Sequence, residues 1–148
     1  MLLALIVWIG GIIFFAFVLA PTLFSVLPSQ QMAGDVVSPT LAKLHSIGLV
    51  SGAAFLACSL LYDRLRYARL RRFTAANVFV VLMLVLTAIS QFSITPRMRE
   101  LRSSNMNAIS VRAEFDRLHG WSTRVEGGVL LLGLGLVVMT ARRWGTSN

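Results

Sequence analysis

Two histidines and one glutamate within apolar sequence are the residues of this chain that could do chemistry. A Lys-Leu-His sequence ending at His45 recurs as Arg-Leu-His ending at His119, half a chain length later, and each histidine opens a long apolar stretch. Imidazole nitrogens bind metal ions and haem iron. If both stretches cross a membrane as helices, the two rings lie at the same depth. His45 and His119 are therefore candidate ligands for a metal ion or haem, and two separately hydrogen-bonded histidines are the alternative.

The glutamate is Glu126, which lies about two helical turns beyond His119. A charged group at the centre of a bilayer costs about 2.5–3.5 kcal/mol, so we expect Glu126 to face the protein interior. One interpretation is an internal ion pair, in which Arg124 or another arginine neutralises the carboxylate. The other is a functional carboxylate that binds a cation or relays a proton.

Other polar residues are expected near these three. Ser122 shares the helical face of His119 and Glu126. Gln91 lies near the outer end of the third apolar stretch. The candidate supporting residues of a polar site are therefore Gln91, Ser122, Arg124 and Glu126.

Motifs for common enzymatic chemistry are missing from the sequence. It has no glycine-rich dinucleotide turn, no phosphate loop, no His-Glu-x-x-His sequence and no arguable Ser-His-Asp arrangement. Cys58 is the single cysteine, which excludes an internal disulfide and a thiolate cluster. We therefore predict that the chain is not an enzyme.

Composition indicates a membrane protein. Of the 148 residues, 56% are hydrophobic and only 14% are charged, with a mean hydropathy of +0.74, whereas a soluble domain contains roughly a quarter charged residues. This excludes soluble globular, disordered and collagen-like classes. The net charge of +8 comes from basic residues between apolar stretches, where they fix topology and meet anionic lipid. The bilayer is thus the expected partner, and nucleic acid is not.

Four apolar stretches are long enough to span a bilayer. Every backbone amide in hydrocarbon must be satisfied within its own segment, so these stretches are expected to be helices. Pro39 is expected to break the chain before the second span, and Pro96 to end the third. The prediction is an all-α integral membrane four-helix bundle, a single domain over residues 1–148. Its predicted spans are 2–23, 41–62, 74–95 and 119–141.

The two halves of the chain resemble each other. Ala20-Pro21 matches Thr95-Pro96 in the same way that the two histidine sequences match. Each half then forms a helical hairpin, and the two hairpins are parallel repeats. The connection 63–72 contains five arginines, so we predict that both termini are cytoplasmic, in an inner or plasma membrane. The long connection 96–119 is predicted either to form amphipathic helices on the outer membrane surface or to extend the third span.

Four short motifs carry a resemblance to a known family. They are WIGG at 8–11, LHSIG at 44–48, ITPRM at 94–98 and FDRLHGWS at 115–122. Together the motifs make the chain similar to the transmembrane-protein-205-like family, and the last of them is the most specific. The family usually has asparagine where this chain has Glu126, so the carboxylate need not have a role that the family shares.

The resemblance implies a four-helix membrane domain without an assigned activity in bacteria. The animal member of the family is associated with platinum-drug resistance and vesicle traffic. The chain is also distantly similar to copper-resistance inner-membrane proteins, which carry histidines near the outer face. Neither likeness implies a particular substrate.

The leading functional hypothesis is the handling of a cation or small solute at an outward-facing polar site, with His45 and His119 as ligands. The alternative is a structural or redox subunit of a membrane complex, with haem between the same two histidines. Four helices are few for a transport path, so we expect a homo-oligomer or a larger membrane complex.

Overall fold

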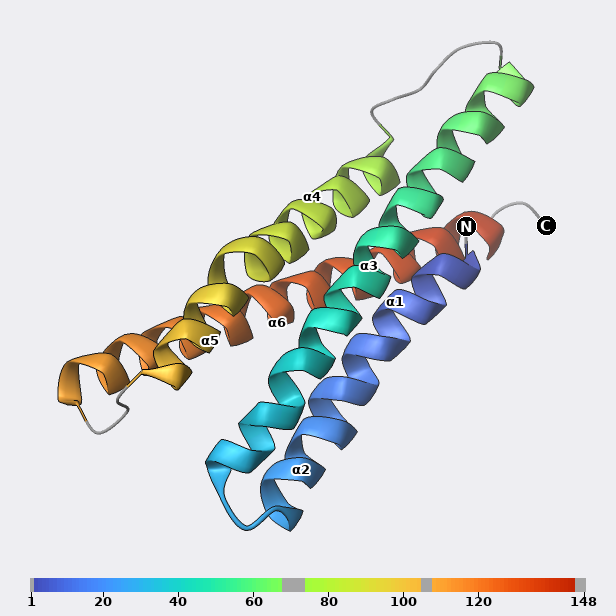
Figure 1. Ribbon diagram of the computed structural model, residues 1–148. Helices are drawn as coiled ribbons and strands as arrows, with labels where there is room; N and C mark the ends of the chain where they lie inside the picture. Colours follow the sequence, from blue (N-terminus) through green and yellow to red (C-terminus); the bar gives the residue numbers. More distant parts are fainter. Residues whose placement is uncertain (1, 68–73, 105–107, 146–148) are drawn as a thin grey trace.

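The computed structural model describes residues 2–67, 74–104 and 108–145, and every regular element in these ranges is a helix (Figure 1). Short π-helical turns, labelled η, interrupt the first and third long helices. The elements in chain order are α1 (Leu2–Phe14), η1 (Phe15–Leu19), α2 (Ala20–Val26), α3 (Gln30–Tyr67), α4 (Ala75–Ile89), η2 (Ser90–Ile94), α5 (Thr95–Ser103) and α6 (Ile109–Gly145).

Four helical rods are long and apolar enough to cross a membrane. They are Leu2–Val26, Gln30–Leu65, Ala75–Ser103 and Ile109–Thr140, and each exceeds the roughly 20 residues that a bilayer crossing requires. Their outward faces carry large apolar side chains, such as Leu3, Phe92 and Leu131, that a soluble protein would bury. The predicted class, an all-helical protein of four long apolar helices, is confirmed, and these helices indicate a multi-pass membrane protein.

The prediction that Pro39 breaks the chain is wrong. Pro39 lies inside α3, which begins at Gln30. A proline in a helix lacks the N–H that would bond to the carbonyl four residues earlier, here that of Asp35. Asp35 is exposed, so water can satisfy that carbonyl at the membrane surface. The second long helix therefore extends about three turns beyond the predicted span.

The prediction that Pro96 ends the third helix is also wrong. The chain turns through η2 and continues as α5 to Ser103, with Pro96 in the first turn of α5. The π turn widens the helix just before the proline, where the ring would otherwise meet the preceding carbonyl. Of the two predictions for the connection 96–119, extension of the third helix is confirmed. The fourth helix also begins earlier than His119, at Ile109.

The core of the bundle surrounds Trp8. Its indole is 1% exposed and lies against Gly48 and Gly52 of α3. A Cβ atom at Gly52 would come within 2.6 Å of the indole, so only glycine allows this approach. The core cluster around the ring contains Leu5, Trp8, Ile9, Ile12, Phe55, Val80, Met83, Val129 and Leu136.

The helices form two pairs that diverge at one end. Figure 1 shows α1 and α2 beside α3, and α4 and α5 beside α6. The pairs are packed together where α1 begins and α6 ends, and they separate toward α2 and α5. The core cluster fills the packed end, and the space between the diverging pairs is where the polar residues gather.

Candidate functional site

A buried histidine joins three elements of the bundle. His45 on α3 is 1% exposed. Its Nδ1 atom lies 3.1 Å from Oε1 of Gln91, which belongs to the π turn η2. Its Nε2 atom lies 3.0 Å from Oε2 of Glu126 on α6. Both hydrogen bonds connect residues far apart in the sequence, so this network locks α3 to both helices of the second pair.

The donors of this network can be arranged in three ways. A doubly protonated ring donates to both oxygens. Alternatively, a neutral ring donates from Nε2 to Glu126, and the amide of Gln91 turns by 180° so that its NH₂ group donates to Nδ1. In the third arrangement, a protonated Glu126 donates to Nε2 and the Nδ1–H group donates to Oε1 of Gln91. In the first two, the ionised carboxylate of Glu126 accepts a hydrogen bond from His45.

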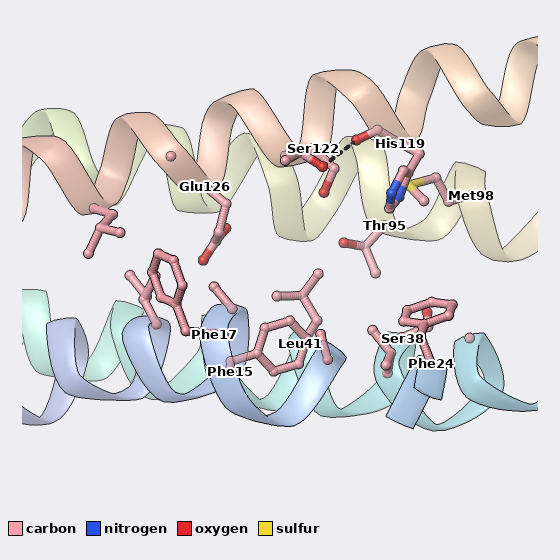
Figure 2. Close-up of a pocket in the computed structure, with 18 of the residues that line it drawn as sticks. Phe15, Phe17, Phe24, Ser38, Leu41, Thr95, Met98, His119, Ser122 and Glu126 are labelled. Carbon is pink, nitrogen blue, oxygen red and sulfur yellow. Dashed lines mark hydrogen bonds between the residues drawn. The ribbon is translucent and has the colours of Figure 1, made fainter. Parts of the chain in front are cut away.

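Glu126 also faces a cavity of about 350 Å³ between the two helix pairs. Figure 2 shows its side chain projecting from α6 toward Phe15 and Phe17, while His119 and Met98 lie farther along the same space, opposite Phe24 and Leu41. The polar residues of the lining are Ser38, Thr95, Arg102, His119, Ser122, Thr123 and Glu126. The remaining lining is apolar: Ile12, Phe15, Ala16, Phe17, Ala20, Phe24, Gly34, Val37, Leu41, Met98, Gly127 and Leu130.

Most of the predicted site residues lie at this cavity or in the hydrogen-bonded network beside it. His45, Gln91 and Glu126 form one hydrogen-bonded network, and Ser122 and His119 line the cavity with Glu126. His119 differs from His45 because it is exposed, with its ring stacked on Phe115 at a centroid distance of 6.3 Å. The two histidines therefore have different surroundings.

Arg124 lies outside this arrangement. It is exposed, and its guanidinium carbon is 5.7 Å from the centre of the Trp121 ring. The partner of Glu126 is His45 rather than Arg124. Of the two interpretations of Glu126, the internal pair thus exists with a different partner, and the carboxylate still faces the cavity.

The donor atoms at the site limit how a metal ion could be held. Within the described ranges, no group of three or more His, Cys, Asp or Glu side chains could hold a metal ion. Both ring nitrogens of His45 are engaged, so its coordination to a metal or haem iron would break one of these two hydrogen bonds. Ligation by His45 and His119 stays a prediction.

Arg102 is a cavity residue that the sequence analysis missed. Its guanidinium lies 3.8 Å from Asp35 on α3 and 5.4 Å from the centre of the Phe115 ring on α6. It also packs on Gly34, where a Cβ atom would come within 2.6 Å of it. Arg102 therefore connects the two diverging helix pairs at the outer end of the cavity. The sequence signal for this contact was Gly34, a residue without a side chain, directly before the acidic Asp35.

A second polar contact lies outside the cavity, toward the packed end. The hydroxyl of Ser59 on α3 donates to Oδ1 of Asn77 on α4 at 2.8 Å. Asp63 follows one turn later on α3, and its Oδ2 atom is buried without a hydrogen-bond partner among the described residues. Sequence analysis identified neither Ser59 nor Asp63.

Comparison with known protein families assigns the chain to one of them. Residues 3–107 match the family described as Domain of unknown function (DUF4149). The chain belongs to the DUF4149 family. The match includes His45 and Gln91 but ends before α6, so the network of this DUF4149 protein is completed by a residue outside the matched region, Glu126.

One relative of this DUF4149 protein comes from Aquifex aeolicus (strain VF5). That relative is described as an uncharacterized protein and is 30% identical over 129 residues, which cover 85% of this chain and 83% of the Aquifex chain. No solved structure matches. The comparisons therefore support a membrane protein of unknown function, and the function has to be argued from the cavity itself.

Proposed function

We propose that this DUF4149 protein binds a small solute or cation in the cavity beside Glu126, as a transporter-like or accessory membrane protein. The main observation behind this proposal is that the carboxylate of Glu126, within a membrane-spanning helix, bonds to the buried His45 and also lines a cavity. Ionisable residues inside a membrane domain are costly and mark ligand or ion sites. The cavity volume, about 350 Å³, lies within the range of small-molecule sites.

The carboxylate has hydrogen-bonding capacity beyond its internal bond. An ionised carboxylate accepts about four hydrogen bonds, and His45 contacts only Oε2. The network with His45 and Gln91 fixes the carboxylate at the cavity wall, as a preorganised binding group requires. Glu126 can therefore bind a ligand while it keeps its internal partner.

The site is proposed to face outward, with both termini cytoplasmic. The helix α3 ends and α4 begins at the packed end of the bundle (Figure 1), and the sequence 63–72 contains five arginines. Positive charge concentrates on the cytoplasmic side. The cavity lies toward the opposite end. The variant Gly127→Cys, made in a Cys58→Ser background, should then react with a membrane-impermeant maleimide in intact cells. It should not react in inside-out vesicles. The reverse pattern would contradict this orientation.

The finer family relationship and the internal repeat are proposals of the same kind. The motif at 115–122 lies outside the DUF4149 match and supports membership in the transmembrane-protein-205-like family. Each half of the chain has a π turn directly before its X-Pro sequence, η1 before Ala20-Pro21 and η2 before Thr95-Pro96. This correspondence supports two parallel repeats.

A test of solute binding needs a variant that fills the cavity without disturbing the fold. Gly127 lines the cavity, and a Cβ atom there meets nothing within 4 Å, so Gly127→Leu places its side chain in the empty space. Gly10 is the matched control, because a Cβ atom there also meets nothing within 4 Å but the residue is exposed on α1 and does not line the cavity.

Binding can be measured by equilibrium dialysis against the protein in lipid nanodiscs, with empty nanodiscs as the reference. The probes are phenylbutylamine, phenylbutanol and phenylbutyrate, which share one apolar body and differ in charge. We expect saturable binding of at least one probe, weakened about tenfold or more by Gly127→Leu, which corresponds to about 1.4 kcal/mol, and unchanged by Gly10→Leu. If no probe shows this dependence on Gly127, the proposed function is wrong.

A further inference from the structure

The charges of the cavity lie at its two ends. Glu126 is at the inner end, where it faces Phe15 and Phe17 of η1 (Figure 2). Arg102 lies over Phe115, which precedes Glu126 on α6 by about three turns, roughly 16 Å along the helix. The guanidinium of Arg102 is also near the carboxylate of Asp35. A ligand at the inner end therefore meets a negative group and is remote from the positive one.

The elements around Glu126 supply no permanent positive charge at the inner end. Residues 2–26, which form α1, η1 and α2, contain no ionisable side chain, and neither do residues 75–94 of α4 and η2. The cavity-lining ionisable groups on the other helices are Arg102 on α5 and His119 on α6, both toward the outer end. A doubly protonated ring of His45 on α3 would neutralise Glu126, whereas a neutral ring donates a hydrogen bond to the ionised carboxylate and leaves its negative charge uncompensated. A cationic ligand would thus complete the charge balance of the inner end.

The walls of the cavity favour an organic rather than an inorganic cation. A bare metal ion needs several oxygen, nitrogen or sulfur ligands, and the described residues contain no group of three such acidic, histidine or cysteine side chains. The inner wall is instead formed by the rings of Phe15 and Phe17, and Phe24 lies farther out. Aromatic faces attract cations and bury apolar groups.

From this combination we infer that the cavity binds an amphipathic organic amine in its protonated form, an inference that rests on the proposed function. The ammonium group lies at Glu126, between the carboxylate and the rings of η1. The apolar body extends outward along Leu41 and Phe24.

The deciding measurement compares the three probes on the wild-type protein and on one charge variant. The wild-type protein is expected to bind phenylbutylamine at least tenfold more tightly than phenylbutanol, and phenylbutyrate least. Glu126→Gln keeps the length of the side chain and an oxygen that accepts from His45, so it removes the charge alone. In this variant the preference for the amine over the alcohol should disappear, with binding of the alcohol unchanged.

A control variant removes the same charge elsewhere on the same helix. Glu114 pairs with Arg97 at the surface and does not line the cavity. Glu114→Gln should retain the wild-type preference. If Glu114→Gln lowers it as much as Glu126→Gln does, the amine is responding to net charge and the inference is overturned.

The outcomes separate this inference from the proposed function. If the alcohol binds the wild-type protein as tightly as the amine, and Gly127→Leu abolishes both, the cavity binds solutes but its ligand is not a cation. If phenylbutyrate binds best, Arg102 rather than Glu126 dominates, and the inference is likewise overturned. The comparison of probes on the wild-type protein decides the inference even if Glu126→Gln does not fold.

Discussion

Replacing His45 by leucine tests the buried network directly. His45 is 1% exposed and the Glu126 side chain 16% exposed, so the pair is shielded from water. Removing the histidine from this pair leaves the carboxylate of Glu126 without compensation, which costs about 3–5 kcal/mol. We expect His45→Leu to lower the free energy of unfolding by this amount, with the larger share arising from the stranded carboxylate of Glu126.

A double-mutant cycle separates this effect from lost packing. Glu126→Leu alone removes the charge and leaves Nε2 of His45 unpaired, at a cost of about 1–3 kcal/mol. Combining it with His45→Leu leaves only Gln91 without its partner, which again costs about 1–3 kcal/mol. The double variant should therefore be more stable than His45→Leu alone. The expected coupling energy, which is the sum of the two single losses minus the loss in the double variant, is about 3–5 kcal/mol.

The assay is reversible unfolding in mixed micelles with increasing SDS, followed by circular dichroism and by tryptophan fluorescence, for which the buried Trp8 is the reporter. His119→Leu is the matched control, since the same substitution at this exposed histidine should change stability by no more than about 0.5 kcal/mol. Equal losses for the two histidine variants, or additive effects of His45→Leu and Glu126→Leu, would refute the reasoning.

Two further predictions concern packing and the amide of the network. Gly48→Ala places a methyl group against the buried indole of Trp8 and should destabilise the protein by about 1–3 kcal/mol. Its control is Gly10→Ala, which has open space around its Cβ atom and should be neutral or stabilising by up to about 1 kcal/mol. The same SDS titration measures both variants. Gln91→Leu leaves a buried ring nitrogen without its partner and should cost about 1–3 kcal/mol, while Gln31→Leu at an exposed position of α3 should change stability little.

Hydropathy predicted the four long helices but not where they begin and end. Apolar length alone identified the segments, because hydrocarbon leaves a chain few alternatives to a helix. The predicted helix boundaries were wrong at Pro39 and Pro96, because proline was expected to break the helix at both positions. The second helix continues with one hydrogen bond missing at the exposed residue Asp35, and a π turn before Pro96 lets the third helix continue. Neither compensation is visible in the local sequence.

The π turns also explain part of what sequence analysis missed at the site. A π turn contains one extra residue, so it rotates everything after it by about 100° relative to an uninterrupted α-helix. Residues that α-helical spacing assigns to one face therefore do not share that face when η1 or η2 lies between them. This is why Phe15 and Phe17, which lie in η1, were not expected beside Glu126, and why Arg102, which follows η2, was not expected at the outer end of the cavity.

The partner of Glu126 could not be chosen from spacing. His45 and Glu126 lie on different long helices, and nothing local to either residue specifies the rotation of those helices. The nearest basic residue in sequence, Arg124, is two positions away and so projects to a different side of α6. Glu126 and His119, in contrast, lie two turns apart on one face, which is why their common position at the cavity was predictable.

The asymmetry of the bundle limits what a single copy can do. The cavity occupies the end where the helix pairs diverge, whereas the other end is filled by Trp8, Met83 and Leu136, each 1% exposed or less. A packed core of this kind does not open without losing a substantial part of the apolar burial that holds the pairs together. One chain is therefore suited to binding a ligand from one side. Passage across the membrane would require a second copy or a partner that supplies the inner half of the path.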